Sequence, residues 1–142
     1  MDRKEFLSLV GLGTAGVVLF GCLGGCNKEA KAPTAPSNVN IALDLTQAGN
    51  VALKTPGGSI VVSNGSIIVA QTLTGGKYLA VSIACPHQSV AVNYDSANND
   101  FYCPAHGSIF TSTGVFQSGP ANGASLTQYK TSINGNILTI TS

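Results

Sequence analysis

Short apolar runs recur along the chain after residue 38, and those over residues 39–45 and 78–83 alternate with smaller or polar residues. Val39, Ile41, Leu43 and Leu45 are separated by single smaller or polar residues, a period of two that is typical of a half-buried β-strand. Further short apolar runs are bounded by turn residues such as Asn-Gly, and they cover residues 60–62, 67–69, 78–83, 129–133 and 137–140. The pattern predicts an all-β fold of antiparallel strands, a sandwich or a barrel.

The first part of the chain has a different pattern. Arg3 and Lys4 precede an uncharged, largely apolar stretch over residues 6–27 that contains six glycines. A basic start before an apolar stretch is typical of a secretory signal. Two sequences similar to the bacterial lipobox end at Cys22 and Cys26, and the small residues before Cys26 favour it as the lipid-carrying cysteine.

Residues 2–8, DRKEFLS, are also similar to a twin-arginine export signal that has lysine as its second basic residue. The alternative is an uncleaved anchor helix, and in both cases the basic start stays inside the cell. We therefore expect a signal peptide over residues 1–25, an Ala/Pro-rich tether over 26–38 and a domain over 39–142. The domain is expected in the cell envelope, outside the cytoplasm and anchored to the membrane.

Composition narrows the range of functions. Only 9% of the residues are charged and the net charge is +1, so the chain can bury a core. No arginine follows Arg3, and three lysines balance three aspartates after residue 38, which excludes the basic surface of a nucleic-acid-binding protein. Glu29 is the last glutamate, so little is left for a pair of catalytic carboxylates. Metal chemistry fits better, because the predicted domain contains a small set of soft thiolate and borderline imidazole ligands. They are Cys85, His87, Cys103 and His106.

These four residues lie in two short segments of the sequence, Cys85-Pro86-His87 and Cys103-Pro104-Ala105-His106. Four such ligands complete one tetrahedral zinc site or give two ligands to each iron of a two-iron cluster. A Cys85–Cys103 disulfide is permitted in an exported domain, but it leaves the neighbouring histidines unexplained. A structural zinc site is disfavoured by the single residue between Cys85 and His87, since zinc ligands are usually separated by two to four residues.

The spacing of the two segments, C-x-H, fifteen residues and C-x-x-H, resembles that of the Rieske [2Fe–2S] domain. Gly107-Ser108 after the second segment also agrees, and Gly119-Pro120-Ala121 is similar to the family's proline loop. The resemblance implies a Rieske-type antiparallel β-sandwich with a small cluster-binding subdomain formed by two loops. It further implies one [2Fe–2S] cluster per chain, with Cys85 and Cys103 on one iron and His87 and His106 on the other.

The chain departs from the family members of quinol-oxidising complexes at three positions. Val90 and Ala105 stand where those members have two cysteines joined by a disulfide that braces the loops. Phe110 replaces a tyrosine that donates a hydrogen bond to a cysteine sulfur, whereas Ser108 is retained and can bond a bridging sulfide. Each hydrogen bond to sulfur stabilises the reduced cluster, so we expect a potential in the lower or middle part of the family's range of about −150 to +300 mV.

The resemblance implies one-electron transfer by a membrane-tethered carrier or by the small subunit of an envelope oxidoreductase, rather than by a stand-alone enzyme. Both histidines would bind the cluster, so none remains for the mononuclear iron of an oxygenase. We expect a redox protein as the partner, in contact with the exposed edge around His87, His106 and Pro120. The alternative function is a zinc-stabilised or metal-free β-sheet module that only binds a partner.

Overall fold

The computed structural model describes residues 34–142. The predicted signal sequence, Cys22, Cys26 and most of the tether therefore lie outside the described residues. Among residues 34–142 there is no helix of the length and apolarity needed to span a membrane. The described elements are ten strands and one short 3-10 helix, so the prediction of an all-β fold is confirmed.

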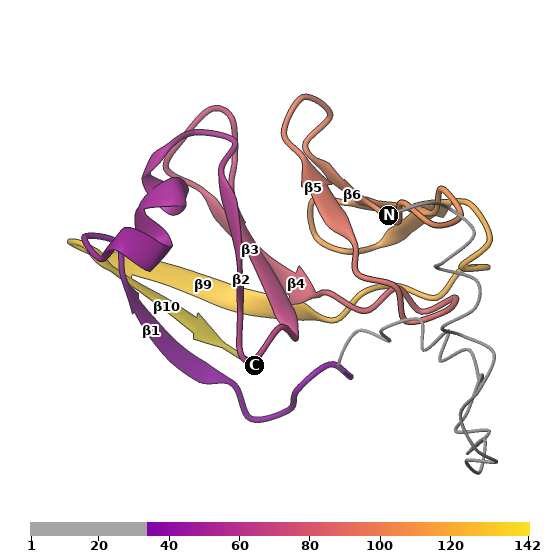
Figure 1. The fold of residues 1–142 in the computed structure, drawn as a ribbon, viewed down its shortest axis with the longest axis horizontal. Helices are drawn as coiled ribbons and strands as arrows, with labels where there is room; N and C mark the ends of the chain where they lie inside the picture. Colours follow the sequence, from indigo (N-terminus) through magenta and orange to yellow (C-terminus); the bar gives the residue numbers. More distant parts are fainter. Residues whose placement is uncertain (1–33) are drawn as a thin grey trace, which may run out of the picture.

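The larger of two antiparallel sheets has six strands in the order β1-β10-β9-β4-β3-β2 (Figure 1). Its strands are β1 (Asn40–Asp44), β2 (Ser59–Val62), β3 (Ile67–Gln71), β4 (Tyr78–Ser82), β9 (Gln128–Asn134) and β10 (Ile137–Thr141). The short apolar runs of the sequence and the turns that bound them predict each of these strands. The two hairpins expected from Asn-Gly turns are also present, joining β2 to β3 and β9 to β10.

The smaller sheet has four strands in the order β5-β6-β7-β8, and Figure 1 shows β5 and β6 beside the larger sheet. Its strands are β5 (Asn93–Asp95), β6 (Asp100–Tyr102), β7 (Ile109–Thr111) and β8 (Phe116–Ser118). The sequence pattern did not predict them, because a strand of three residues is too short to show an alternation. It also missed the 3-10 helix η1 (Ala48–Lys54), which packs against β2 and β3 and buries Leu53.

Strands β3 and β4 lie between two hydrophobic cores. Ile68 and Val81 belong to one core, whereas Val69 and Ala80 belong to the other. Successive side chains of a strand point to opposite faces, and each of these two pairs is also a cross-strand pair of the sheet. All five residues of β3 are buried, as expected of a strand that is covered on both faces. A slip of one residue would exchange the side chains of the two cores, so this register is strongly specified.

The two cores differ in what they contain. The first lies between the two sheets and includes both cysteines of the predicted domain; its remaining buried members are Ile68, Val81, Ile83, Val92, Phe101, Phe110, Ala121 and Leu126. The second core is enclosed by the larger sheet and η1, with Leu53, Leu138 and Ile140 fully buried. Each candidate ligand segment therefore begins with a cysteine that belongs to the first core.

The first ligand segment is a closed loop, Cys85–Val90. The Cys85 N–H donates to the Val90 carbonyl at 2.8 Å, and the Cys85 carbonyl accepts a hydrogen bond from the Ser89 N–H at 2.7 Å. Ser89 has φ 56°, in the left-handed region. These two bonds hold the loop in a single tight turn.

The second ligand segment, Cys103–Ser108, repeats this pattern. The Cys103 N–H donates to the Ser108 carbonyl at 2.8 Å, and the Cys103 carbonyl accepts from the Gly107 N–H at 2.9 Å. Gly107 has φ 75° and is the counterpart of Ser89 in the first loop. Each loop therefore begins with a cysteine that is bonded twice through its own backbone, and each requires a left-handed residue at its fifth position.

We predict that Ser89→Gly stabilises the protein by about 0.5–1 kcal/mol. Left-handed backbone costs a residue with a Cβ about 1–2 kcal/mol, and the greater freedom of glycine in the unfolded chain offsets part of this gain. The measurement is the midpoint of thermal or urea unfolding of the iron-loaded protein. Ser63→Gly, at φ 57° in the β2–β3 hairpin, is the matched control and should give a similar gain. A loss of stability confined to Ser89→Gly would contradict this account of the first loop.

Candidate metal centre

The first loop is held on an extension of β4. Ile83 follows this strand, and its N–H donates to the Ser66 carbonyl at 2.9 Å while its carbonyl accepts from the Val92 N–H at 2.8 Å. A single β-bridge between Ala84 and Ala91 closes the base of the loop. The first loop is therefore held in place by the β3–β4 pair, which is buried on both faces.

The second loop joins β6 to β7. These strands are paired directly before and after it, with Tyr102 opposite Ile109 and Phe101 opposite Phe110. Both phenylalanines are fully buried. The smaller sheet thus serves as the base of the second loop, as the extension of β4 does for the first loop.

The two cysteines are buried and lie against each other. Cys85 and Cys103 are each 1% exposed, and both are free thiols. Burial raises the pKa of the Cys85 thiol, the backbone N–H of His87 lowers it, and the hydrogen bond that the protonated Cys85 thiol shares with the Cys103 sulfur raises it again, so that the net shift of the pKa is upward. The loops therefore bring together two sulfurs that are 18 positions apart in the sequence, at the edge of the core.

The two histidines are exposed and also lie side by side. The ring centroids of His87 and His106 are 4.8 Å apart, and the ring planes meet at 85°. Each histidine is at the outer part of its loop, next to exposed Pro86 or Ala105. The structure therefore pairs the predicted ligands across the two loops, as an inner cysteine pair and an outer histidine pair.

The arrangement of the cysteines and histidines in two pairs can be compared with the ligand sets of a zinc site and of a two-iron cluster. Within residues 34–142, no group of three or more Cys, His, Asp or Glu side chains converges on the position of one metal ion. A structural zinc needs four ligands on one ion, whereas a two-iron cluster takes two protein ligands on each iron. The pairing of cysteine with cysteine and of histidine with histidine matches the two protein ligands that each iron of such a cluster takes.

Ser108 is fully buried behind the second loop. Its Oγ accepts a hydrogen bond from the Ala121 N–H at 3.1 Å, so its own O–H remains available to donate. Phe110 is fully buried in the same core as the cysteines, 6.3 Å from the ring of Phe116, and has no polar atom to offer. Pro120 is exposed, one residue before Ala121. Of Ser108, Phe110 and Pro120, only Ser108 thus has a side chain that can donate a hydrogen bond.

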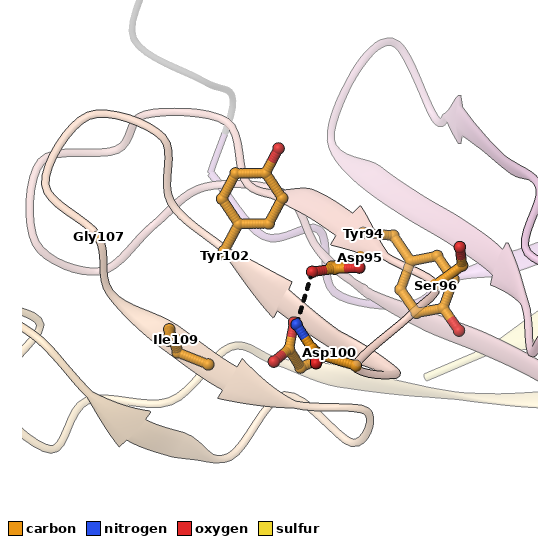
Figure 2. A pocket seen from close by; sticks show the side chains of 8 residues that line it. Tyr94, Asp95, Ser96, Asp100, Tyr102, Gly107 and Ile109 are labelled. Carbon is orange, nitrogen blue, oxygen red and sulfur yellow. Dashed lines mark hydrogen bonds between the residues drawn. The ribbon is translucent and has the colours of Figure 1, made fainter.

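A hollow of about 490 Å³ lies beside the second loop (Figure 2). None of the four predicted ligands lines it. Asp95 and Asp100, paired across β5 and β6, line it together with Tyr94, Tyr102 and Gly107. Burial raises the pKa of Asp100, and the charge of Asp95 raises it further. Of the three aspartates in residues 34–142, two are therefore gathered next to the second loop. The sequence gives no signal for this pair, because both aspartates lie on strands too short to be recognised from their pattern.

Comparison with known proteins agrees with the site. Residues 39–130 match the family model described as the Rieske [2Fe–2S] domain. The cytochrome b6-f complex iron–sulfur subunit of Chlorobaculum tepidum is 30% identical over 132 residues, which cover 93% of this chain and 71% of the relative. The subunit with the same name from Chlorobaculum thiosulfatiphilum is 41% identical over 66 residues, which are 46% of this chain and only 36% of that relative.

Solved structures similar to this chain include a Rieske protein and a ferredoxin of a dioxygenase. The plasma membrane Rieske protein PetC3 from Synechocystis PCC 6803 has a TM-score of 0.53 and 30% identity, covering 74% of this chain and 100% of its own. The ferredoxin of carbazole 1,9a-dioxygenase from Nocardioides aromaticivorans IC177 has a TM-score of 0.54 at 18% identity, covering 75% and 98%, and shows the fold alone. The chain belongs to the Rieske [2Fe–2S] domain family, and it binds a [2Fe–2S] cluster through which it transfers single electrons.

Proposed function

We propose that Cys85 and Cys103 bind one iron of the cluster and that His87 and His106 bind the other. The observation that carries this proposal is the separation of the four residues into a buried cysteine pair and an exposed histidine pair. When bound, the cluster supplies a centre that accepts and returns one electron. The buried cysteines keep water away from one side of this centre, and the exposed imidazoles form its solvent-facing side.

The histidines set the electrostatics of the site. A neutral imidazole in place of a thiolate removes negative charge, which raises the reduction potential above that of a site with four cysteines. Each ring that binds iron through one nitrogen has a second nitrogen that can gain or lose a proton at the exposed face. His87 and His106 can therefore couple electron transfer to protonation on the side that a partner approaches.

We further propose that the chain acts in the cell envelope as a membrane-tethered carrier or as the small subunit of an oxidoreductase. The relatives in Chlorobaculum are named as subunits of the cytochrome b6-f complex, and PetC3 is a plasma membrane protein. The basic start, the apolar stretch and the lipobox-like sequences at Cys22 and Cys26 support the tether. The redox partner is expected at the edge formed by His87, His106 and Pro120, all of which are exposed.

The ligand assignment predicts that His87→Ala and His106→Ala each abolish or strongly deplete the cluster. The measurement is electron paramagnetic resonance of the dithionite-reduced protein together with iron, sulfide and zinc analysis. The unaltered protein should show a rhombic signal with an average g below two and about two irons per chain. Gln88→Ala, an exposed position on the first loop, is the matched control and should retain both. Zinc without iron in the unaltered protein would instead support the β-sheet binding module.

A second prediction concerns Phe110. Phe110→Tyr places a hydroxyl donor in the core that contains both cysteines, and a new hydrogen bond to sulfur should raise the reduction potential. Phe116→Tyr adds the same hydroxyl to the neighbouring half-buried ring and should leave the potential unchanged. Potentiometric titration distinguishes the two variants. An unchanged or lower potential in Phe110→Tyr would mean that Phe110 acts in packing alone.

The proposed lipid tether at Cys26 predicts that substitutions of Cys26 and Cys22 affect lipidation and membrane association differently. Cys26→Ser should abolish incorporation of labelled fatty acid and release the protein from the detergent phase, because it removes the thiol that carries the lipid. Cys22→Ser should retain both the label and the membrane association. The reverse result would place the lipid on Cys22. Membrane association without label in the unaltered protein would identify the segment as an uncleaved anchor helix.

A further inference from the structure

The loop that contains Pro120 lies against the second ligand loop without space for a side chain between them. A Cβ on Gly119 would lie 2.5 Å from the Ser108 Cα and 2.9 Å from the Ser108 nitrogen. Real Cβ atoms do not approach heavy atoms so closely, and the φ of Gly119, 102°, is in a region that favours glycine. Gly119 therefore allows direct contact between its own backbone and the backbone of Ser108.

The same two segments are joined by a buried hydrogen bond. The Ala121 N–H donates to the Ser108 Oγ at 3.1 Å, although the two residues are 13 positions apart and the whole of β7 and β8 lies between them. Ser108 is fully buried and Ala121 is 6% exposed, so bulk water does not compete for either atom. The Ser108 carbonyl is in turn the acceptor for the Cys103 N–H. Ser108 thus links the Pro120 loop directly to a cysteine.

A serine hydroxyl needs such a partner if it is to donate in one direction. Rotation about χ1 gives three staggered positions, and the hydroxyl hydrogen rotates to suit its neighbours. In this structure the Ala121 N–H occupies one side of the Ser108 oxygen. The acceptor side of the oxygen is therefore fixed, and the O–H is left for another acceptor.

We propose that Gly119 and Ala121 are positioning residues that act through Ser108. Gly119 permits the close approach of the Pro120 loop, and Ala121 orients the Ser108 oxygen so that its O–H donates toward the cluster. The reduction potential then depends on the backbone of residues 119–121, because a hydrogen bond to cluster sulfur favours the reduced state. This inference rests on the proposed function of the two ligand loops.

The test compares reduction potentials of the full-length, iron-loaded variants. Ser108→Ala should lower the potential, and Gly119→Ala should lower it by at least half as much, since the added Cβ moves the Pro120 loop away from Ser108. Gly123→Ala is the matched control: its φ is also positive, 84°, but nothing lies within 4 Å of the added Cβ, so the potential should not change. An unchanged potential in Gly119→Ala would overturn the proposal.

The double variant Ser108→Ala/Gly119→Ala shows whether Gly119 acts through the serine. The two shifts should not add, and the double variant should have the potential of Ser108→Ala alone. Fully additive shifts would overturn the proposal, because they would place the effect of Gly119 elsewhere.

A backbone variant keeps the proposal testable if Gly119→Ala fails to bind iron. Ala121→Pro removes the N–H that donates to Ser108, so it should lower the potential in the unaltered background and have no effect in Ser108→Ala. An unchanged potential in Ala121→Pro would overturn the proposal. Iron content and the resonance signal of the unaltered protein report separately on the cluster: their absence would reject the proposed function, whereas normal values with unshifted variants would reject the positioning role alone.

Discussion

The burial of β3 and β4 on both faces is the constraint on which the rest of the structure depends. Their alternate residues fill two separate cores, so neither strand can slip in register without placing the wrong side chains in both. Because β4 continues into Ile83 and the first ligand loop, the fixed register also fixes the depth of Cys85. The larger sheet therefore contributes to the site mainly by holding β4 in place. The second loop is fixed independently, by the pairing of β6 with β7.

The division of the four proposed ligands into inner cysteines and outer histidines follows from the backbone of the loops. In each loop the cysteine comes first, and its N–H and carbonyl are both bonded within the loop, so its side chain stays at the edge of the core. The histidine comes two residues later in the first loop and three residues later in the second, where the chain has already turned toward solvent. Loops with the same backbone pattern can therefore present thiols inward and imidazoles outward.

The sequence predicted the part of this arrangement that has a local signature. Short apolar runs, two of them with a period of two, mark the six strands of the larger sheet, and the cysteine and histidine spacings resemble those of a known family. These strands and the grouping of Cys85, His87, Cys103 and His106 were therefore predicted. Strands β5–β8 were missed because three residues carry too little pattern. The contacts of Ser108 with Gly119 and Ala121 could not be read from the sequence either, because they depend on how two distant turns fold against each other.

These contacts also explain how the two loops are braced without a disulfide between them. Val90, which occupies one of the two missing cysteine positions, is half-buried against the core, and its carbonyl holds the Cys85 N–H. Ala105, at the other position, is exposed and makes no comparable contribution through burial. The second loop is instead held from behind, where Gly119 packs on Ser108 and Ala121 bonds its side chain. Each loop is thus fixed to its own support by packing and hydrogen bonds.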